Sequence, residues 1–185
     1  MRIGGGDRGG RRIKTKARTR QGLRPTSSRA RTAIFNILPH DLSGLKALDL
    51  FAGSGALGLE ALSRGADLAV FVDAGREAFR LIQDNLRGLD YRDRGQLLSK
   101  KVGPALQELR EHGARFDLIF MDPPYDKGLV EKTLQQLAGM HLLQPEGTVV
   151  VEHSGREMPG ASYPPLALKD QRRYGDSWVS FYTRE

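Results

Sequence analysis

The chain has 185 residues, which is enough for one full α/β domain and too few for two domains of ordinary size. It contains no cysteine, which excludes disulfide bonds and thiolate metal sites. Its four histidines lie too far apart for a local metal-binding motif, so we expect no metal. The sequence shows neither a secretory signal nor an apolar run of membrane-spanning length, and we expect a cytoplasmic protein.

The net charge of +7 is concentrated near the N-terminus, because residues 1–31 contain eleven Lys and Arg and a single acid, Asp7. A basic arm ahead of a nearly neutral body is typical of proteins that bind phosphates, although solvated basic tails are also common. We therefore predict a basic arm over residues 1–25 and a separate domain over residues 26–185. The side chains expected to bind nucleic acid are Arg8, Arg11, Arg12, Lys14, Lys16, Arg18, Arg20 and Arg24.

The first elements in chain order are a glycine-rich arm and a helix. Repeated glycines with little apolar content predict a short β-hairpin or a flexible arm at the start of the chain. Thr26, Ser27 and Ser28 can cap a helix that ends before Pro39. The apolar face of this helix holds Ala30, Ile34, Ile37 and Leu38, and Arg29 and Arg31 are expected elsewhere on it.

From Lys46 onward, short apolar runs alternate with amphipathic helices, which predicts a doubly wound, mostly parallel sheet. The predicted strands cover residues 47–51, 68–72, 96–99, 116–121 and 148–152. The predicted helices are one that ends at Arg64, one that buries Ala78, Leu81, Ile82, Leu86 and Leu89, and two over residues 104–109 and 129–137.

The C-terminal segments 168–174 and 178–183 leave no room for a helix between them, so we predict an antiparallel hairpin. We expect Tyr174 and Trp178 in the core of this hairpin. A Rossmann-like sheet that ends in such a hairpin is the architecture associated with S-adenosylmethionine methyltransferases. That association concerns the fold alone.

The segment Asp49–Gly58 leads from the first sheet strand into a helix and has the composition of a cofactor loop. Gly53 and Gly55 lack a Cβ, so the backbone can turn tightly and approach a ligand. With Gly58 they also match the dinucleotide-binding pattern. Asp73 follows the next strand, where an acid accepts hydrogen bonds from ribose hydroxyls in either family.

The charge of the cofactor separates these two families. A dinucleotide presents a pyrophosphate, whereas S-adenosylmethionine presents a sulfonium and an ammonium group. Asp49 can attract the cationic methionine end. The alternatives are that the Asp49 carboxylate only braces the loop and that Asp73 is only an exposed acid at the end of a strand. We predict S-adenosylmethionine as the cofactor, with contacts from Asp49, Phe51, Gly53, Ser54, Gly55 and Asp73.

The tetrapeptide Asp122-Pro-Pro-Tyr125 directly follows the fourth strand, at the edge where ligands bind in doubly wound folds. An exocyclic amine is a poor nucleophile because its lone pair is delocalised into the ring. The Asp122 carboxylate and the Pro123 carbonyl can accept its two N–H groups and direct the lone pair at a sulfonium methyl. Pro123 and Pro124 stiffen the loop, and Tyr125 offers a face for an extruded base. These four residues are the predicted catalytic residues, with a rigid polar turn as the alternative.

Together these motifs resemble the bacterial small-subunit ribosomal RNA guanine-N2 methyltransferases. The resemblance spans nearly the whole chain and includes Arg24-Pro-Thr26 with the helix after it, and Tyr174-Gly-Asp176. It implies methylation of one guanine amine of ribosomal RNA within a partly assembled subunit, by a protein whose default state is a monomer.

The same resemblance implies further contacts to the cofactor. It places Arg24 and Thr26 close to the cofactor pocket, although they can equally be a phosphate contact and a helix cap. Val102 falls in the region that contacts adenine. There Lys100 and Lys101 stand where many related enzymes have an acid or an amide, so backbone groups are expected to make the contact.

Three other functions stay open. An adenine-N6 DNA methyltransferase shares the Asp-Pro-Pro-Tyr chemistry, but the residues before Lys46 are few for a sequence-reading region. An NAD-dependent oxidoreductase uses the same glycine loop and leaves Asp122–Tyr125 unexplained. A non-catalytic RNA-binding or assembly factor keeps the fold, although the intact Asp122 and loop glycines argue against it.

Overall fold

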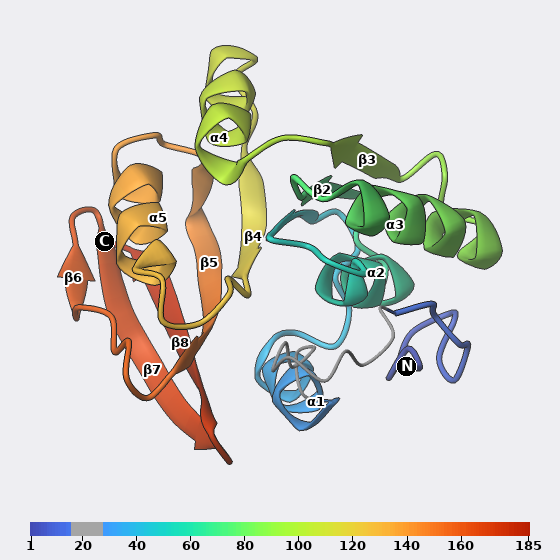
Figure 1. Ribbon diagram of the computed structural model, residues 1–185, viewed down its shortest axis with the longest axis horizontal. Coiled ribbons are helices and arrows are strands. Elements are labelled where there is room, and N and C mark those ends of the chain that lie inside the picture. Colours follow the sequence, from blue (N-terminus) through green and yellow to red (C-terminus); the bar gives the residue numbers. More distant parts are fainter. Residues whose placement is uncertain (16–27) are drawn as a thin grey trace.

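The alternating apolar strands and amphipathic helices form one eight-stranded sheet with helices on both faces (Figure 1). The computed structural model describes residues 1–15 and 28–185. The helices are α1 (Ser28–Ile37), α2 (Ala56–Ser63), α3 (Arg76–Leu89), α4 (Val102–Glu111) and α5 (Leu129–Ala138). The strands are β1 (Lys46–Leu50), β2 (Leu68–Val72), β3 (Gly95–Leu98), β4 (Phe116–Met121), β5 (Leu143–Ser154), β6 (Ser162–Tyr163), β7 (Leu166–Tyr174) and β8 (Ser177–Arg184).

The strand order is β3-β2-β1-β4-β5-β8-β7-β6, parallel from β3 to β5 and antiparallel beyond β5. The order reverses between β1 and β4, which opens a crevice at their carboxyl ends. Helices α1, α2 and α3 cover one face and α4 and α5 the other, each set over its own apolar cluster (Figure 1). The predicted α/β architecture with a terminal antiparallel hairpin is confirmed.

The predicted elements differ from the observed ones mainly at their ends. Strand β5 starts earlier than predicted, because Leu143 already pairs with Phe116 ahead of a register shift. The short strand β6 was not predicted. None of the helices in the described ranges is both long and apolar enough to cross a membrane. On α3, Leu81 is half-buried, and the other predicted core residues, Ala78, Ile82, Leu86 and Leu89, are buried.

Residues 1–15 form a hairpin-like segment that packs on α2 and α3. Arg2 and Arg12 make an antiparallel bridge, and Ile3 and Ile13 are buried in the core. The Asn85 side chain on α3 continues the pairing, because it accepts the N–H of Lys14 at 2.7 Å and donates to the Lys14 carbonyl at 2.9 Å. Of the two predicted states, hairpin or flexible arm, these residues adopt the hairpin.

The glycine run at the N-terminus allows this packing. Gly6 has a φ of +77°, and a Cβ there would lie 1.7 Å from the carbonyl oxygen of Ser63 at the end of α2. That carbonyl accepts the N–H of Asp7 at 2.7 Å, and the Ser63 hydroxyl donates to the carbonyl of Gly5 at 2.6 Å. Only a residue without a side chain lets the segment come this close to the helix.

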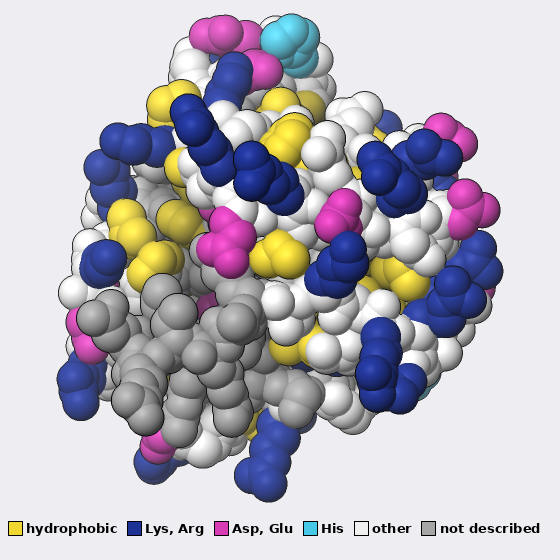
Figure 2. Space-filling view, turned by 45° about the vertical axis from the view of Figure 1, so that its right-hand side comes forward, with side chains coloured by type: hydrophobic (Ala, Val, Ile, Leu, Met, Phe, Trp, Pro, Cys, Tyr) yellow, Lys and Arg dark blue, Asp and Glu magenta, His cyan; other side chains and the backbone are white. Residues whose placement is uncertain are grey.

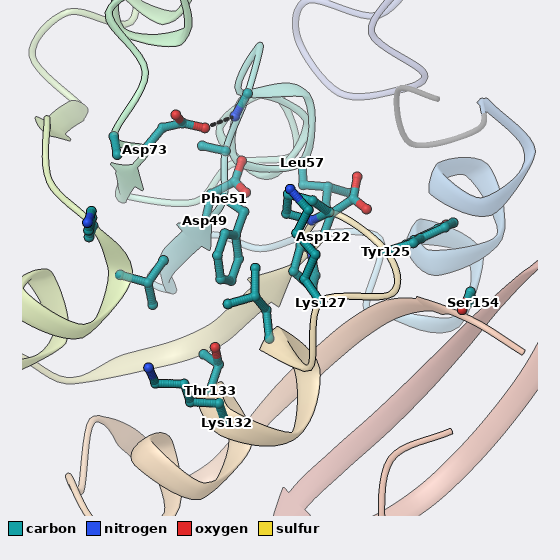
Figure 3. Close-up of a pocket in the computed structure, with 18 of the residues that line it drawn as sticks. Asp49, Phe51, Leu57, Asp73, Asp122, Tyr125, Lys127, Lys132, Thr133 and Ser154 are labelled. Carbon is teal, nitrogen blue, oxygen red and sulfur yellow. Dashed lines mark hydrogen bonds between the residues drawn. The ribbon is translucent and has the colours of Figure 1, made fainter. Parts of the chain in front are cut away.

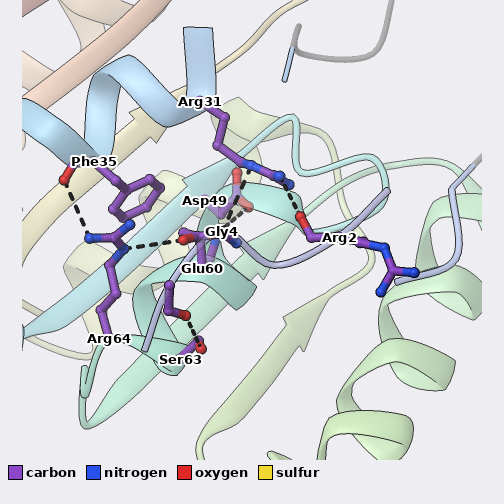
Figure 4. A network of polar contacts seen from close by, with 10 residues as sticks. Arg2, Gly4, Arg31, Phe35, Asp49, Glu60, Ser63 and Arg64 are labelled. Carbon is purple, nitrogen blue, oxygen red and sulfur yellow. Dashed lines mark hydrogen bonds and ion pairs between the residues drawn. The ribbon is translucent and has the colours of Figure 1, made fainter. Parts of the chain in front are cut away.

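A buried ion network joins α1, α2 and the N-terminal segment (Figure 4). Glu60 on α2 is 1% exposed and accepts the N–H of Gly4 at 2.7 Å, with Arg64 Nε at 3.2 Å and Arg31 Nε at 3.9 Å. We had expected Arg31 away from the apolar face of α1. It is buried instead, because Glu60 and the carbonyl of Arg2 bind its guanidinium. Burial lowers the pKa of Arg31, and the Glu60 charge opposes that shift.

Candidate active site

A cleft of about 1860 Å³ opens at the carboxyl ends of β1, β2 and β4, where the strand order reverses (Figure 3). The fold brings the glycine loop after β1 and the tetrapeptide after β4 together there, although they are far apart in the sequence. The predicted site residues that line it are Asp49, Phe51, Gly53, Ser54, Asp73, Val102, Asp122, Pro123, Pro124 and Tyr125.

Two carboxylates brace the glycine loop from the cleft floor. Asp49 is buried and accepts the N–H of Gly58 at 2.9 Å. Asp73 accepts the N–H of Gly53 at 2.9 Å with one oxygen and the N–H of Gly75 at 2.8 Å with the other. Both carboxylates also face the cleft, so the bracing role and the cofactor role coincide at the same residues (Figure 3).

Three carboxyl groups, those of Asp49, Asp73 and Asp122, line the cleft where the glycine loop and the tetrapeptide meet. Burial raises the pKa of Asp49 well above its usual value, and the charges of Asp122 and Asp73 act in the same direction. The N–H of Gly58 opposes the shift. Three carboxylates this close together favour a cationic ligand over a pyrophosphate.

The three loop glycines have different roles. Gly53 lines the cleft with a φ of +58°, a conformation that side chains disfavour. Gly55 does not line it; its φ of +78° starts α2, and a Cβ there would lie 3.1 Å from Phe71. At Gly58 a Cβ would lie 2.4 Å from Phe71. Gly55 and Gly58 therefore allow α2 to pack closely on β2, and only Gly53 of the three is placed to contact a ligand.

Phe51 points into the cleft (Figure 3), and Val102 also lines it, so both add apolar surface to its wall. Phe51 follows β1 with a φ of +60°, and this left-handed conformation turns the chain out of the strand. Lys100 and Lys101 also line this wall, and the Lys100 ammonium pairs with Glu108 on α4.

Hydrogen bonds to residues of β5 and β8 hold the Asp122–Tyr125 loop in place. The Tyr125 hydroxyl donates to Glu152 at 3.1 Å and bonds the hydroxyl of Ser177 at 2.9 Å. Burial and the charge of Glu152 raise the pKa of Tyr125, so the phenol stays protonated. The Tyr125 ring therefore has a fixed orientation at the cleft.

The residues after the tetrapeptide are anchored as well. One carboxylate, that of Glu157, accepts the N–H of Asp126 and the N–H of Gly128, each at 2.6 Å. Asp126 itself has a φ of +58° and accepts a hydrogen bond from Ser154 at 3.2 Å. Loop β4–α5 is thus tied to the segment that follows β5.

The outer part of the cleft is lined by residues that the sequence analysis did not assign to the site. They come from the β4–α5 loop, the end of β5 and the residues just after it, and the β7–β8 hairpin, and they are Lys127, Ser154, Arg156, Arg173, Asp176 and Trp178. The predicted hairpin could have indicated that a C-terminal segment lies beside β5. No local pattern indicates which of its side chains face the cleft.

Trp178 corrects one of our predictions. Tyr174 packs against the core as predicted, but Trp178 is only half-buried and lines the cleft. A Cβ at Gly155 would lie 3.0 Å from the indole Nε1, so the neighbouring residue has no side chain to cover the ring.

In the described part of the arm, the predicted nucleic-acid residues Arg8, Arg11, Arg12 and Lys14 do not line the cleft. Arg8 is half-buried, donates to the carbonyl of Leu89 at 2.9 Å and stacks on Tyr91, and Lys14 pairs with Asp84 at 2.8 Å. Figure 2 shows Lys and Arg side chains spread over this side of the molecule with acidic ones between them. Arg11 and Arg12 are exposed. Lys16, Arg18, Arg20, Arg24 and Thr26 lie outside the described residues.

The strand order and the position of the cleft define a Rossmann-like methyltransferase fold. A family model described as "Conserved hypothetical protein 95" matches residues 1–183. The chain belongs to this family.

Several relatives of this chain are named as methyltransferases. The chain is 32% identical to the "Putative rRNA methyltransferase YlbH" of Bacillus subtilis, over 100% of this chain and 99% of that protein. It is 36% identical to "Ribosomal RNA small subunit methyltransferase D" of Escherichia coli, over 82% of this chain and 74% of that protein. A solved structure, "Putative methyltransferase yhhF from Escherichia coli", has a TM-score of 0.83 and 32% identity over 100% of this chain and 98% of that one.

The fold also recurs at lower identity. A solved structure described as "a putative methyltransferase complexed with SAH" is 16% identical with a TM-score of 0.66, over 83% of this chain and 48% of that one. At this distance the likeness concerns the fold.

Proposed function

We propose that this protein is an S-adenosylmethionine-dependent ribosomal RNA methyltransferase that modifies the exocyclic 2-amino group of a guanine in small-subunit RNA. The observation that carries the proposal is the meeting of Asp122–Tyr125 with the braced glycine loop in one cleft. Relatives named as ribosomal RNA methyltransferases support the class of substrate. The guanine amine is the finer part of the proposal and follows from the resemblance of the motifs.

The residues of the cleft fit the cofactor by charge. Asp49 faces the cationic methionine end, and Asp73 accepts the ribose hydroxyls with the lone pairs that Gly53 and Gly75 leave available. Phe51 and Val102 supply apolar contacts at the adenine. When bound, S-adenosylmethionine supplies a methyl group on a positively charged sulfur, which the carboxylates of the floor favour over an anionic ligand.

The target amine is oriented by Asp122 and by the carbonyl of Pro123. Both accept N–H groups of the amine and direct its lone pair toward the methyl group. Because positive charge develops on nitrogen during transfer, these acceptors bind the transition state more strongly than the ground state. The carboxylate of Asp122 is a weak base, so its main role is orientation and electrostatic stabilisation.

Tyr125 supplies the surface against which the base lies. Its hydroxyl is held by Glu152 and Ser177, so the ring does not need to be ordered when the base arrives. Pro123 and Pro124 restrict the loop in the same way. The site is therefore preorganised for a planar base extruded from its stack.

The partner that we propose is ribosomal RNA in a partly assembled small subunit, bound by a monomer in the cytoplasm. A chain of 185 residues has little surface for reading a base sequence. The shape of a folded RNA particle can supply the address instead.

Transfer of a labelled methyl group from S-adenosylmethionine tests the proposal. Small subunits from a strain that lacks the enzyme, total RNA and DNA are offered side by side, and the labelled nucleoside is identified after digestion. We expect N2-methylguanosine from the ribosomal RNA. Label in DNA as N6-methyladenine, or no label despite cofactor binding, contradicts the proposal.

Asp122→Ala is the accompanying variant. We expect transfer to fall by about 1000-fold, because both orientation and charge stabilisation are lost, while most of the affinity for the cofactor is kept, because Asp49 and Asp73 remain. Asp170→Ala removes a half-buried carboxylate on β7 that pairs with Arg172 and does not line the cleft, and it is the matched control. Transfer by Asp122→Ala at the wild-type rate excludes the catalytic assignment.

A further inference from the structure

The outer rim of the cleft combines an aromatic ring with a cationic side chain on the β7–β8 hairpin. Trp178 on β8 and Arg173 on β7 are direct cross-strand partners, and both line the cleft. Neither is used by the proposed cofactor or by the proposed target base. The rim is continuous with the catalytic loop, because Tyr125 bonds Ser177, the residue next to Trp178.

The indole of Trp178 is held but not covered. Its strand neighbours Ser177 and Val179 are buried, whereas Trp178 is half-buried. Gly155 lies beside the indole ring, and a Cβ at this position would lie 3.0 Å from Nε1. A tryptophan held in this way offers a flat face at low entropic cost, which is the kind of surface on which unstacked nucleobases bind.

Arg173 is placed to bind a phosphate beside that ring. Its Nε donates to the carbonyl of Gly175 at 2.9 Å, which fixes the guanidinium at the hairpin turn. The side chain is exposed at the cleft, and its terminal N–H groups match the geometry of a phosphate. Arg156 adds a second exposed guanidinium on the same rim, paired with Asp126 at 3.4 Å.

We propose that Trp178 and Arg173 form a subsite for the RNA nucleotide adjacent to the methylated base. The base of this nucleotide stacks on the indole, and its phosphate binds the guanidinium of Arg173. The inference rests on the proposed function and deepens it, because it states how the neighbouring nucleotide is bound when the target base lies on Tyr125. A nucleotide must be unstacked from its neighbours to reach this rim, so the subsite selects a single-stranded or distorted segment.

The chain supplies a matched control for the charge. Arg172 precedes Arg173 on β7 and is exposed as well, but successive strand residues point to opposite faces. It pairs with Asp170 at 2.8 Å and does not line the cleft. Arg172→Gln therefore changes the net charge as Arg173→Gln does, without touching the rim.

The experiment measures binding of small ribosomal subunits from a strain that lacks the enzyme, in the presence of S-adenosylhomocysteine and over a range of salt concentrations. We expect Trp178→Ala to weaken binding about tenfold and Trp178→Phe to weaken it clearly less, because phenylalanine keeps a stacking face. We expect Arg173→Gln to weaken binding and to make the slope of log affinity against log salt shallower by about 0.7, as for one phosphate contact of a single strand. Arg172→Gln should retain the wild-type affinity and slope.

Thermal unfolding checks that each variant is folded. If Trp178→Ala is unstable, Trp178→Phe tests the aromatic contact, because its smaller ring is expected to bind RNA more weakly than the indole does. The subsite is overturned if Arg173→Gln and the folded Trp178 variant both keep the wild-type affinity for RNA. It is also overturned if Arg172→Gln and Arg173→Gln lose the same amount of affinity. Methyl transfer by the wild type is measured separately. Normal methylation of RNA with unchanged binding by the rim variants refutes the subsite alone, whereas methylation of DNA in place of RNA refutes the proposed function.

Discussion

At the scale of single residues, the cleft is organised by carboxylates whose surroundings differ. Asp49 is buried beneath the loop, whereas Asp73 and Asp122 are half-buried at its edge. Each of the two bracing acids accepts backbone N–H groups, so removal of either affects both the loop and the charge of the floor. Separating these effects requires substitutions that keep the acceptor and remove the charge.

Asp49→Asn makes that separation at the cleft floor. The amide oxygen can still accept the N–H of Gly58, but the negative charge is lost. We expect the affinity for S-adenosylmethionine to fall about tenfold, which is about 1.4 kcal/mol, with little change in the unfolding temperature. Isothermal titration calorimetry measures the affinity, and Asp170→Asn on β7, which does not line the cleft, is the control. An unchanged dissociation constant would show that Asp49 only braces the loop.

The contributions of the Tyr125 ring and of its hydroxyl can be separated in the same way. Tyr125→Phe keeps the stacking face and removes the bonds to Glu152 and Ser177, so we expect kcat/KM for RNA to fall about fivefold. Tyr125→Ala also removes the ring, and we expect a loss of about 100-fold. Steady-state methyl transfer measures both variants. Equal losses in the two would contradict a stacking role for the ring.

At the scale of elements, the N-terminal segment is held by close backbone packing against α2. The glycines there had suggested flexibility, but Gly6 lies where any side chain would collide with the carbonyl of Ser63. Ile3 and Ile13 add apolar burial on the same side. The segment therefore belongs to the folded core, and the basic residues that it carries are attached to a fixed surface.

Gly6→Ala should destabilise the protein by about 3 kcal/mol, because the new Cβ meets backbone atoms and the residue has a positive φ. Gly10→Ala is the matched control. Its φ of +80° is similar, but nothing lies within 4 Å of the added Cβ, so only the conformational cost of about 1 kcal/mol applies. Urea denaturation measures both. Equal destabilisation of the two variants would contradict the packing argument.

At the scale of the whole molecule, the antiparallel strands β8 and β7 complete a sheet that would otherwise end at β5. The joint between β5 and β8 contains the buried side chain of His153, whose Nε2 lies 2.8 Å from the Ser180 hydroxyl. Burial lowers the pKa of His153, and its hydrogen bond to the Ser154 carbonyl only partly offsets this. The neutral imidazole is thus part of the folded sheet.

A lowered pKa in the folded state gives a definite dependence of stability on pH. In the window below the unfolded pKa of about 6.5, the unfolded chain binds a proton at His153 that the folded chain does not. The free energy of unfolding therefore falls as pH decreases through this window, by at most about 1.4 kcal/mol per pH unit. Denaturation at pH 7.5 and 5.5 measures the fall, and His153→Gln should show a smaller one. An equal fall in both proteins would assign the effect to other groups.

Most elements of this protein and its two central motifs were predictable from the sequence, because periodicity and turn chemistry are local properties. The strands β2 and β4, the loop at Asp49–Gly58 and the tetrapeptide at Asp122 all follow from residues that are neighbours in the chain. That the two motifs share a cleft also followed, because parallel strands bring their carboxyl ends to one edge of the sheet.

Contacts between distant segments were decided only by the tertiary structure. The burial of Arg31 depends on Glu60, the fixed orientation of Tyr125 depends on Glu152 and Ser177, and the exposure of Trp178 depends on Gly155. The local pattern indicates a different environment for each residue: a surface charge for Arg31, a loop aromatic for Tyr125 and a core indole for Trp178. Its environment is set by partners whose distance in the sequence carries no periodic signal, so only the packed molecule shows which surroundings it has.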